Sequence, residues 1–248
     1  MRESYKLLIV AVLFGLSFSA RAQDVIPLSS EPHHHLALHN SYANVYRVEV
    51  NPHDSVRLHR HDYDAISIML GDAEVTVHVP DKPDAHQNLT NGQVRLQRQG
   101  YIHSTEIDGD KLYRNVTVEL LNPQHNPRNL CAPVIPGQPL DCPNESKTES
   151  SKLNAQPQYE TDETNVTLAT LVPHQQTTVK NRSSALLLIA LDDFVVGSPI
   201  KKLLRAGDFL WIGKPEESKL LKNESVNPAR FVTFRFKTPL VSTAPENH

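Results

Sequence analysis

The sequence predicts an all-β protein built from two tandem β-barrels, and three observations support this. Short runs of alternating apolar and polar residues, such as YANVYRVEV (42–50) and AEVTVHV (73–79), follow one another along the chain. Asn, Asp, Pro and Gly separate these runs, and no amphipathic helix pattern interrupts them. A second series of such runs repeats the first, so we expect two copies of one β unit of about 80 residues.

The first 22 residues have the pattern of a secretory signal peptide. Arg2 and Lys6 form a basic start, Leu7 to Ala20 is an apolar run, and Ala20-Arg21-Ala22 fits a small-x-small cleavage site. The apolar run is too short to span a membrane as a helix, and no later run approaches the length that a span needs. We therefore expect an exported protein, periplasmic or extracellular after cleavage near Ala22, with no membrane span.

The net charge of the chain argues against some classes of binding partner. Cleavage after Ala22 removes three basic residues and one acidic residue, which moves the formal net charge from −3 to −5. A mildly acidic chain without a basic cluster argues against nucleic acid and against an anionic membrane surface as partners. The partner that remains is a small-molecule ligand or substrate.

Changes in composition divide the mature chain. Residues 23–40 carry EPHHHLALH without strand or helix periodicity, and we expect a flexible N-terminal arm there. Residues 123–158 are rich in Pro, Asn and Ser, which predicts a linker laid over the surface. The expected order is signal peptide 1–22, arm 23–40, first barrel 41–122, linker 123–158, second barrel 159–240 and tail 241–248.

The two cysteines bracket the proline-rich segment CAPVIPGQPLDC in the expected linker. In an exported protein, Cys131 and Cys142 are typical of one structural disulfide. Closing so short a loop contributes roughly 3 kcal/mol in the chain-entropy model. The alternative, a redox pair, usually has the closer C-x-x-C spacing.

An offset of 121 residues aligns the second series of strands with the first. Pro52-His53 then meets Pro173-His174, and the apolar residues Ile66, Ile68 and Leu70 meet Leu187, Ile189 and Leu191. Later in the chain, RQGYIH (98–103) parallels RAGDFL (205–210), and RNVTVEL (114–120) parallels RFVTFRF (230–236). The apolar positions persist while the turns change length, as expected for a repeated fold unit.

This repeat serves as an internal control for the histidines of the first copy. The second copy has Lys180, Arg182, Ala185 and Leu210 at the positions aligned with His59, His61, Asp64 and His103. Both copies keep the core pattern, so the fold does not need these histidines. We therefore predict that they were added to the scaffold for a function.

The spacing of the histidines predicts a metal site. Alternate side chains of a strand lie on one face about 6.5 to 7 Å apart, so the imidazoles of His59 and His61 can converge on one ion. His103 follows Gly100 after another strand and can supply a third imidazole. Neutral imidazoles suit Fe, Mn, Ni, Cu or Zn, and three of them leave positions open for water, oxygen or substrate.

These residues resemble the two motifs of the cupins, a family of small β-barrels. His59-Arg60-His61 and Gly71 are similar to the first motif, with Asp64 where the family has Glu, and Gly100-Tyr101-Ile102-His103 is similar to the second. The resemblance covers about 41–122 and 159–240. It implies two tandem cupin-type barrels (double-stranded β-helix or jelly roll), a bicupin with a metal site in the first barrel and a degenerate second barrel.

The sequence departs from the family pattern around Asp64. Asp is one methylene shorter than Glu, and two residues separate it from His61 where three or four are usual. Proline and asparagine, which often flank the second motif, are missing. Asp64 is therefore predicted either as a fourth ligand or as a turn residue. Glu106 and Glu119 are weaker substitutes as ligands.

Three further side chains near the predicted ligands have open roles. His78 faces either the barrel interior or solvent. Tyr63 and Tyr101 flank the predicted ligands, where they either gate the site or simply pack.

Two functional hypotheses follow. The first is an exported metalloenzyme that binds one divalent transition metal, a small-molecule dioxygenase or an isomerase, with Asp64 or Glu106 as candidate catalytic base. The second is a non-catalytic binding or sensor protein on the same scaffold. No residue identifies the substrate. The resemblance also raises a homodimer, because cupins often pair through barrel edges.

Overall fold

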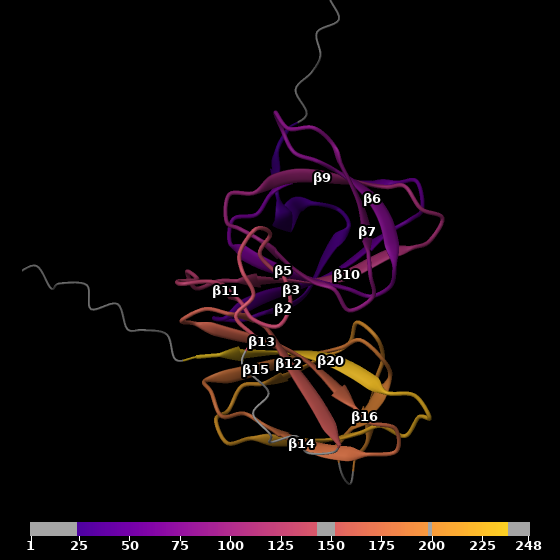
Figure 1. Ribbon diagram of the computed structural model, residues 1–248, viewed down its shortest axis with the longest axis vertical. Helices are drawn as coiled ribbons and strands as arrows, with labels where there is room; N and C mark the ends of the chain where they lie inside the picture. The colour runs from indigo at the N-terminus through magenta and orange to yellow at the C-terminus, as the bar shows by residue number, and fades with distance from the viewer. Residues whose placement is uncertain (1–23, 143–151, 198–199, 238–248) are drawn as a thin grey trace, which may run out of the picture.

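The computed structural model describes residues 24–142, 152–197 and 200–237, which form an all-β protein (Figure 1). They contain twenty strands and one short 3-10 helix, η1 (Leu28–Ser30). The predicted fold class is therefore confirmed. The expected signal peptide and tail lie outside the described residues. In the described part of the chain, no helix is long and apolar enough to cross a membrane.

The first barrel consists of two five-stranded sheets. One sheet has the order β1 (Ile26–Pro27), β4 (Ser55–Arg60), β9 (Ile102–Ile107), β6 (Ala73–His78) and β7 (Ala85–Leu89). The other has the order β2 (His34–His39), β3 (Ala43–Val50), β10 (Tyr113–Leu120), β5 (Asp64–Met69) and β8 (Val94–Gln97). Apart from the parallel pair of β1 and β4, neighbouring strands are antiparallel, as in other jelly rolls.

The second barrel repeats this arrangement. Its larger sheet has the order β11 (Arg128–Asn129), β12 (Leu153–Glu160), β13 (Thr164–Leu171), β20 (Ala229–Phe236), β15 (Ala185–Ala190) and β18 (Phe209–Ile212). Its smaller sheet has the order β14 (Gln176–Lys180), β19 (Ser218–Lys222), β16 (Phe194–Val196) and β17 (Lys202–Leu204).

The two barrels pack against each other through one sheet each, as the middle of Figure 1 shows. The residues of this shared core alternate along their strands with residues that face the barrel interiors. From the first barrel, the shared core takes Ile66 and Ile68 of β5 and Val116 and Val118 of β10. From the second barrel it takes side chains of β15 and β20, including Leu187, Ile189, Val232 and Phe234. Strands with two buried faces explain the nearly continuous apolar runs in these parts of the sequence.

The structure differs from the expected N-terminal arm. Residues 34–39 form β2, which pairs with β3 and has a register shift between Leu36 and Leu38. The corresponding strand of the second barrel, β12, begins at Leu153 inside the expected linker and has a register shift between Pro157 and Tyr159. Many side chains of these two bulged strands are exposed to solvent. Neither strand therefore shows the strict apolar-polar alternation that identifies a half-buried strand.

The strand registers also correct one part of the repeat alignment. His59 pairs with His103 in the first barrel, and the aligned Lys180 pairs with Ser218 in the second. The counterpart of His103 is therefore Ser218, and the prediction of Leu210 is wrong. The error arose because two similar Arg-x-Gly turns were matched: the turn at 98–100 follows β8 and leads to β9, whereas the turn at 205–207 comes before β18, the counterpart of β8. The second barrel still has no histidine at this position.

The predicted disulfide is present. Cys131 and Cys142 are bonded, and the loop between them is held by Asn129, whose side chain contacts the backbone of Ile135 and Gln138. Val134 of this loop is buried in the shared core between the barrels. The bridge therefore fixes a loop that packs on both barrels, as expected for a structural disulfide.

Candidate metal centre

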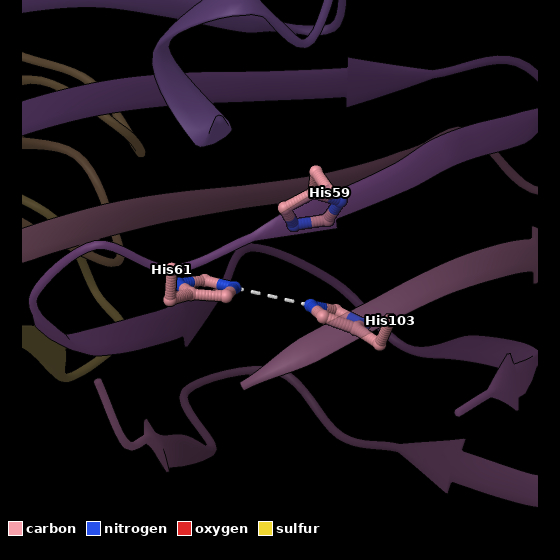
Figure 2. A group of neighbouring side chains, drawn as sticks. All are labelled: His59, His61 and His103. Carbon is pink, nitrogen blue, oxygen red and sulfur yellow. Dashed lines mark hydrogen bonds between the residues drawn. The ribbon is translucent and has the colours of Figure 1, made fainter. Parts of the chain in front are cut away.

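His59, His61 and His103 converge inside the first barrel (Figure 2). His59 lies on β4 and pairs directly with His103 on β9, so both side chains point to the same face. A register shift between Val56 and His59 adds one residue to β4, which allows both of these residues to face the interior. His61 follows the strand, and its backbone N–H donates to the Tyr101 carbonyl at 3.0 Å.

The ring nitrogens of the triad lie close together. One nitrogen from each histidine lies within 4.8 Å of those of the other two. Nε2 of His61 and Nε2 of His103 face each other at 3.1 Å, as the dashed line in Figure 2 shows. Two nitrogens that each lie about 2.1 Å from one ion would be about 3.0 Å apart in octahedral and about 3.4 Å apart in tetrahedral coordination. The observed separation fits either geometry.

The surroundings leave a ligand atom of the triad without a partner. Nδ1 of His59 donates to the Arg57 carbonyl at 2.8 Å, which places the proton on Nδ1 and leaves the lone pair on Nε2. That Nε2 is buried and has no hydrogen-bond partner within the described residues. A backbone carbonyl that orients an imidazole from behind is typical of metal-binding histidines.

Burial keeps the three imidazoles neutral at pH 7. Desolvation lowers the pKa of His59 to about 4 and, with the nearby His59, lowers the pKa of His61 to about 3. Desolvation and the same neighbours also place the pKa of His103 well below its usual value. A neutral imidazole is the form that binds a transition metal. The donor set, its geometry and the free lone pair of His59 therefore fit one divalent transition metal.

Asp64 does not join the triad. Its buried carboxylate accepts hydrogen bonds from Nε of Arg98 at 2.9 Å and from the backbone N–H of Gln99 at 2.8 Å. Both contacts hold the turn that leads into Tyr101 and His103. In the structure Asp64 therefore supports this turn, in line with the alternative reading as a turn residue, and the fourth-ligand reading is not supported.

The other candidates also lie away from the three histidines. The side chain of Glu106 is 57% exposed and forms an ion pair with Nε2 of His78 at 3.5 Å, while Nδ1 of His78 binds Asp84. These contacts raise the pKa of His78, which faces solvent. Tyr63 is exposed as well, whereas the ring of Tyr101 stacks on His103 with 4.8 Å between centroids. Tyr101 is thus the flanking tyrosine that contacts the site.

Glu119 lies on β10 and is buried. Its Oε2 accepts hydrogen bonds from Asn44 at 2.8 Å and from the Tyr46 hydroxyl at 3.2 Å. Burial raises the pKa of Glu119, although these two donors oppose the rise. Glu119 is therefore a satisfied interior carboxylate and not one of the converging groups.

The sequence analysis missed His34, which lies in the segment expected to be a mobile arm. The ring of His34 lies 5.2 Å from the ring of His59, between centroids, and lines the same small cavity as the triad. Its Nδ1 donates to the buried carboxylate of Glu31 at 2.7 Å. Glu31 also accepts from the backbone N–H of Arg57, so this contact ties the N-terminal segment to β4. The buried Glu31, three residues before His34, was the available signal.

Two cavities that share lining residues lie at the triad. A cavity of about 30 Å³ lies among the histidines and is large enough for an ion with a water molecule. A larger cavity of about 310 Å³ adjoins it, and His103, Gln97, Thr105 and Tyr113 line both. Tyr101 also borders the larger cavity. Its volume suits a small organic molecule.

The interior of the second barrel is filled instead. Leu188, Phe231 and Ile212 stand at the registers where the first barrel has Ser67, Asn115 and Gln97, and they belong to one buried apolar cluster. In the described part of the chain, the triad is the one group of three His, Cys, Asp or Glu side chains that could hold a metal. The polar cavity is therefore a property of the first barrel and not of the fold.

Comparisons with known proteins show the fold. No model of a protein family matches the sequence, and no curated protein matches it. Among solved structures, AerE from Microcystis aeruginosa has a TM-score of 0.57 at 10% identity, over 83% of this chain and 98% of its own. A variant of salicylate 1,2-dioxygenase from Pseudoaminobacter salicylatoxidans, in complex with gentisate, has a TM-score of 0.59 at 13% identity, over 84% and 75%. These cupin-fold structures show that this chain has the cupin fold.

Proposed function

We propose that the protein is an exported metalloenzyme of bicupin architecture that binds one divalent transition metal in its first barrel. The main support for this proposal is that three buried, neutral imidazoles converge beside a cavity large enough for a small organic ligand. The hydrogen bond from Nδ1 of His59 to the Arg57 carbonyl fixes the tautomer of one of these imidazoles. When bound, such a metal supplies redox or Lewis-acid chemistry at coordination positions that three histidines leave open. The apolar second barrel serves as a structural partner.

Dioxygenase-like oxidation of a small molecule is the reaction class that we favour. Among the described residues, neither Asp nor Glu lines the two cavities at the triad. An isomerisation would need a carboxylate base at the site. Neither candidate can serve, because Asp64 is bound to Arg98 and Glu106 is exposed. An oxidation that relies on the metal makes no such demand. The structural similarity to salicylate 1,2-dioxygenase also supports this class.

The residues of the chain would orient and shield the substrate. Tyr101 stacks on His103 and borders the larger cavity, so its ring can hold a planar substrate beside the metal. Burial raises the pKa of Tyr101, so its hydroxyl stays protonated at pH 7 and can donate to a substrate oxygen. The apolar side chains on β6 and β7 that line this cavity exclude water.

A binding or sensor protein is the alternative. This alternative is favoured because Asp64 binds Arg98 and does not join the three histidines. Three protein ligands therefore remain where the cupin pattern has four. A module that only holds a ligand needs the cavity and does not need full metal occupancy. Metal content and oxygen consumption therefore separate the two functions.

The experiment is elemental analysis of the mature protein, expressed to the periplasm without a histidine tag. The test variant is His59→Ala/His61→Ala. The control is His35→Ala/His39→Ala, which removes two exposed histidines of β2 and leaves the triad intact. We expect near-stoichiometric Fe, Mn, Ni, Cu or Zn in wild type and control, and its loss in the test variant with the fold retained. Wild type that neither contains nor takes up metal would overturn the enzyme proposal.

The identity of the metal then narrows the reaction. Iron, manganese, nickel or copper supports oxidation, and an oxygen electrode with candidate substrates tests it directly. Zinc has no redox chemistry in proteins, so a zinc-only protein would contradict the dioxygenase class.

A further inference from the structure

We propose that Arg95 makes the larger first-barrel cavity a binding site for a small organic carboxylate. This inference deepens the proposed function by naming the substrate class for the same site. Arg95 lies on β8, and its side chain lines the cavity of about 310 Å³ together with His103 of the triad.

The strand register places Arg95 on the inner face of the barrel. Arg95 pairs with Ser67 of β5, and directly paired residues of antiparallel strands point to the same face. Ser67 lines the small cavity at the triad, so Arg95 points inward as well. In the second barrel, the same register pairs Leu188 with Leu210. An interior arginine is therefore not required by this fold.

Arg95 has no protein partner that neutralises its charge. No ion pair or side-chain hydrogen bond of Arg95 is present among residues 24–142, 152–197 and 200–237. Arg98, three residues later, is in contrast bound to Asp64. An arginine in a cavity without a carboxylate leaves its planar fork of donors free. A carboxylate ligand would match this fork and balance the charge.

The charge of Arg95 acts on the groups around the cavity. It opposes the rise that burial causes in the pKa of Tyr101 and of Tyr113. Arg95 lines one cavity together with both tyrosines and His103, so an anion bound by Arg95 would lie next to the metal site.

The remaining lining indicates the shape of the ligand. Val75, Val77 and Leu89 of β6 and β7 line the cavity opposite the polar groups of β8, and they suit an apolar body. The amide of Gln97 donates to Ser67 Oγ at 3.0 Å, while its buried Oε1 has no partner among the described residues. Gln97 therefore retains an acceptor for the ligand. Pro136 of the disulfide loop also borders the cavity.

The test compares an acid with its neutral amide on the metal-loaded mature protein. Isothermal titration with benzoate and benzamide probes an aromatic body, and hexanoate and hexanamide probe an aliphatic one. We expect at least one acid to bind more tightly than its amide by about tenfold or more, as for hydrogen bonds to charged groups. Inorganic phosphate is the control for any small anion.

Three variants test whether the Arg95 side chain causes the tighter binding of the acid. Arg95→Leu, which copies the residue of the second barrel, should weaken binding of the acid about 10- to 100-fold and leave binding of the amide unchanged. Arg95→Lys keeps the charge and should retain part of the affinity. Arg182→Leu removes one positive charge from an exposed position of the second barrel and should have no effect.

The proposal is overturned if neither acid binds more tightly than its amide, if phosphate binds more tightly than both acids, or if folded Arg95→Leu binds the acid like wild type. If Arg95→Leu does not fold, the acid and amide pairs on wild type still decide. Elemental analysis of the same samples keeps the two proposals apart. Acid binding without metal leaves an anion-binding module, and metal without acid binding leaves an enzyme for another substrate class.

Discussion

The Glu31 carboxylate binds the N-terminal segment to β4 of the first barrel. Replacement of Glu31 by Gln should destabilise the protein by about 3 kcal/mol. The buried carboxylate accepts four hydrogen bonds, from the backbone N–H groups of His33 and Arg57 and from Nδ1 of His33 and His34. An amide has one acceptor oxygen, so Glu31→Gln leaves two of the four donors unpaired. At about 1.5 kcal/mol for each bond to a charged group, the loss is about 3 kcal/mol.

The lowered pKa of Glu31, which reflects the same hydrogen bonds, corresponds to a similar magnitude. Burial alone would raise this pKa, but the hydrogen bonds from His34 and His33 outweigh it and lower the pKa from 4.5 to about 2. At about 1.4 kcal/mol per tenfold change, this difference also corresponds to about 3 kcal/mol. A carboxylate with a lowered pKa in the folded state contributes its full stability above pH 4.5. The contribution is lost as the pH falls through about 2.

The assay is urea unfolding of wild type and Glu31→Gln at pH 7 and pH 3. We expect the difference in unfolding free energy to be about 3 kcal/mol at pH 7 and about 1.5 kcal/mol at pH 3. Glu49→Gln is the control, because Glu49 forms an exposed pair with Arg114 that is worth less than about 1 kcal/mol. A difference below 1 kcal/mol at pH 7, or one that does not change between the two pH values, would refute this account of Glu31.

Two further predictions concern the site and its neighbours. Asp64→Asn should leave the metal content unchanged while lowering the unfolding free energy by about 1 to 3 kcal/mol, because it removes the negative charge that strengthens the hydrogen bond from Arg98. Loss of the metal in this variant would contradict the prediction. The metal-free protein should lose stability as the pH falls from 6.5 towards 4. In this range the histidines of the unfolded chain take up protons, whereas the buried His59 and His61, with pKa values of about 4 and about 3, stay neutral in the folded protein. Thermal unfolding of the metal-free wild type and of His59→Ala/His61→Ala checks this, and parallel pH profiles would count against it.

The sequence predicted the triad because its signal is local. His59 and His61 are two residues apart, and His103 follows a glycine at the start of a strand, so short-range spacing already placed three imidazoles on inward positions. The internal repeat strengthened the prediction, since the second copy keeps the core and lacks these histidines. The exact counterpart of His103 was misassigned to Leu210, because similar Arg-x-Gly turns precede different strands in the two copies.

The structure directs Asp64 to the turn and not to the triad, for a physical reason. Sequence proximity to His61 says that the carboxylate is near, but its direction depends on the turn at residues 98–100, which comes from a distant part of the chain. Arg98 and the backbone N–H of Gln99 offer Asp64 two donors at this turn. A buried carboxylate takes the donors that are closest, because an unpaired charge in the interior is costly.

By itself, the sequence determined the all-β class, the repeat, the disulfide and the three histidines, because alternation and spacing are properties of single strands and short loops. Only the tertiary structure decided that His34 lies against His59, that Arg95 faces the cavity and that Asp64 turns away. These outcomes depend on the bulge in β4 and on the pairing of strands far apart in sequence. Because a shift of one residue turns every side chain of a strand to the opposite face, the periodicity of one strand cannot fix what it meets across the barrel.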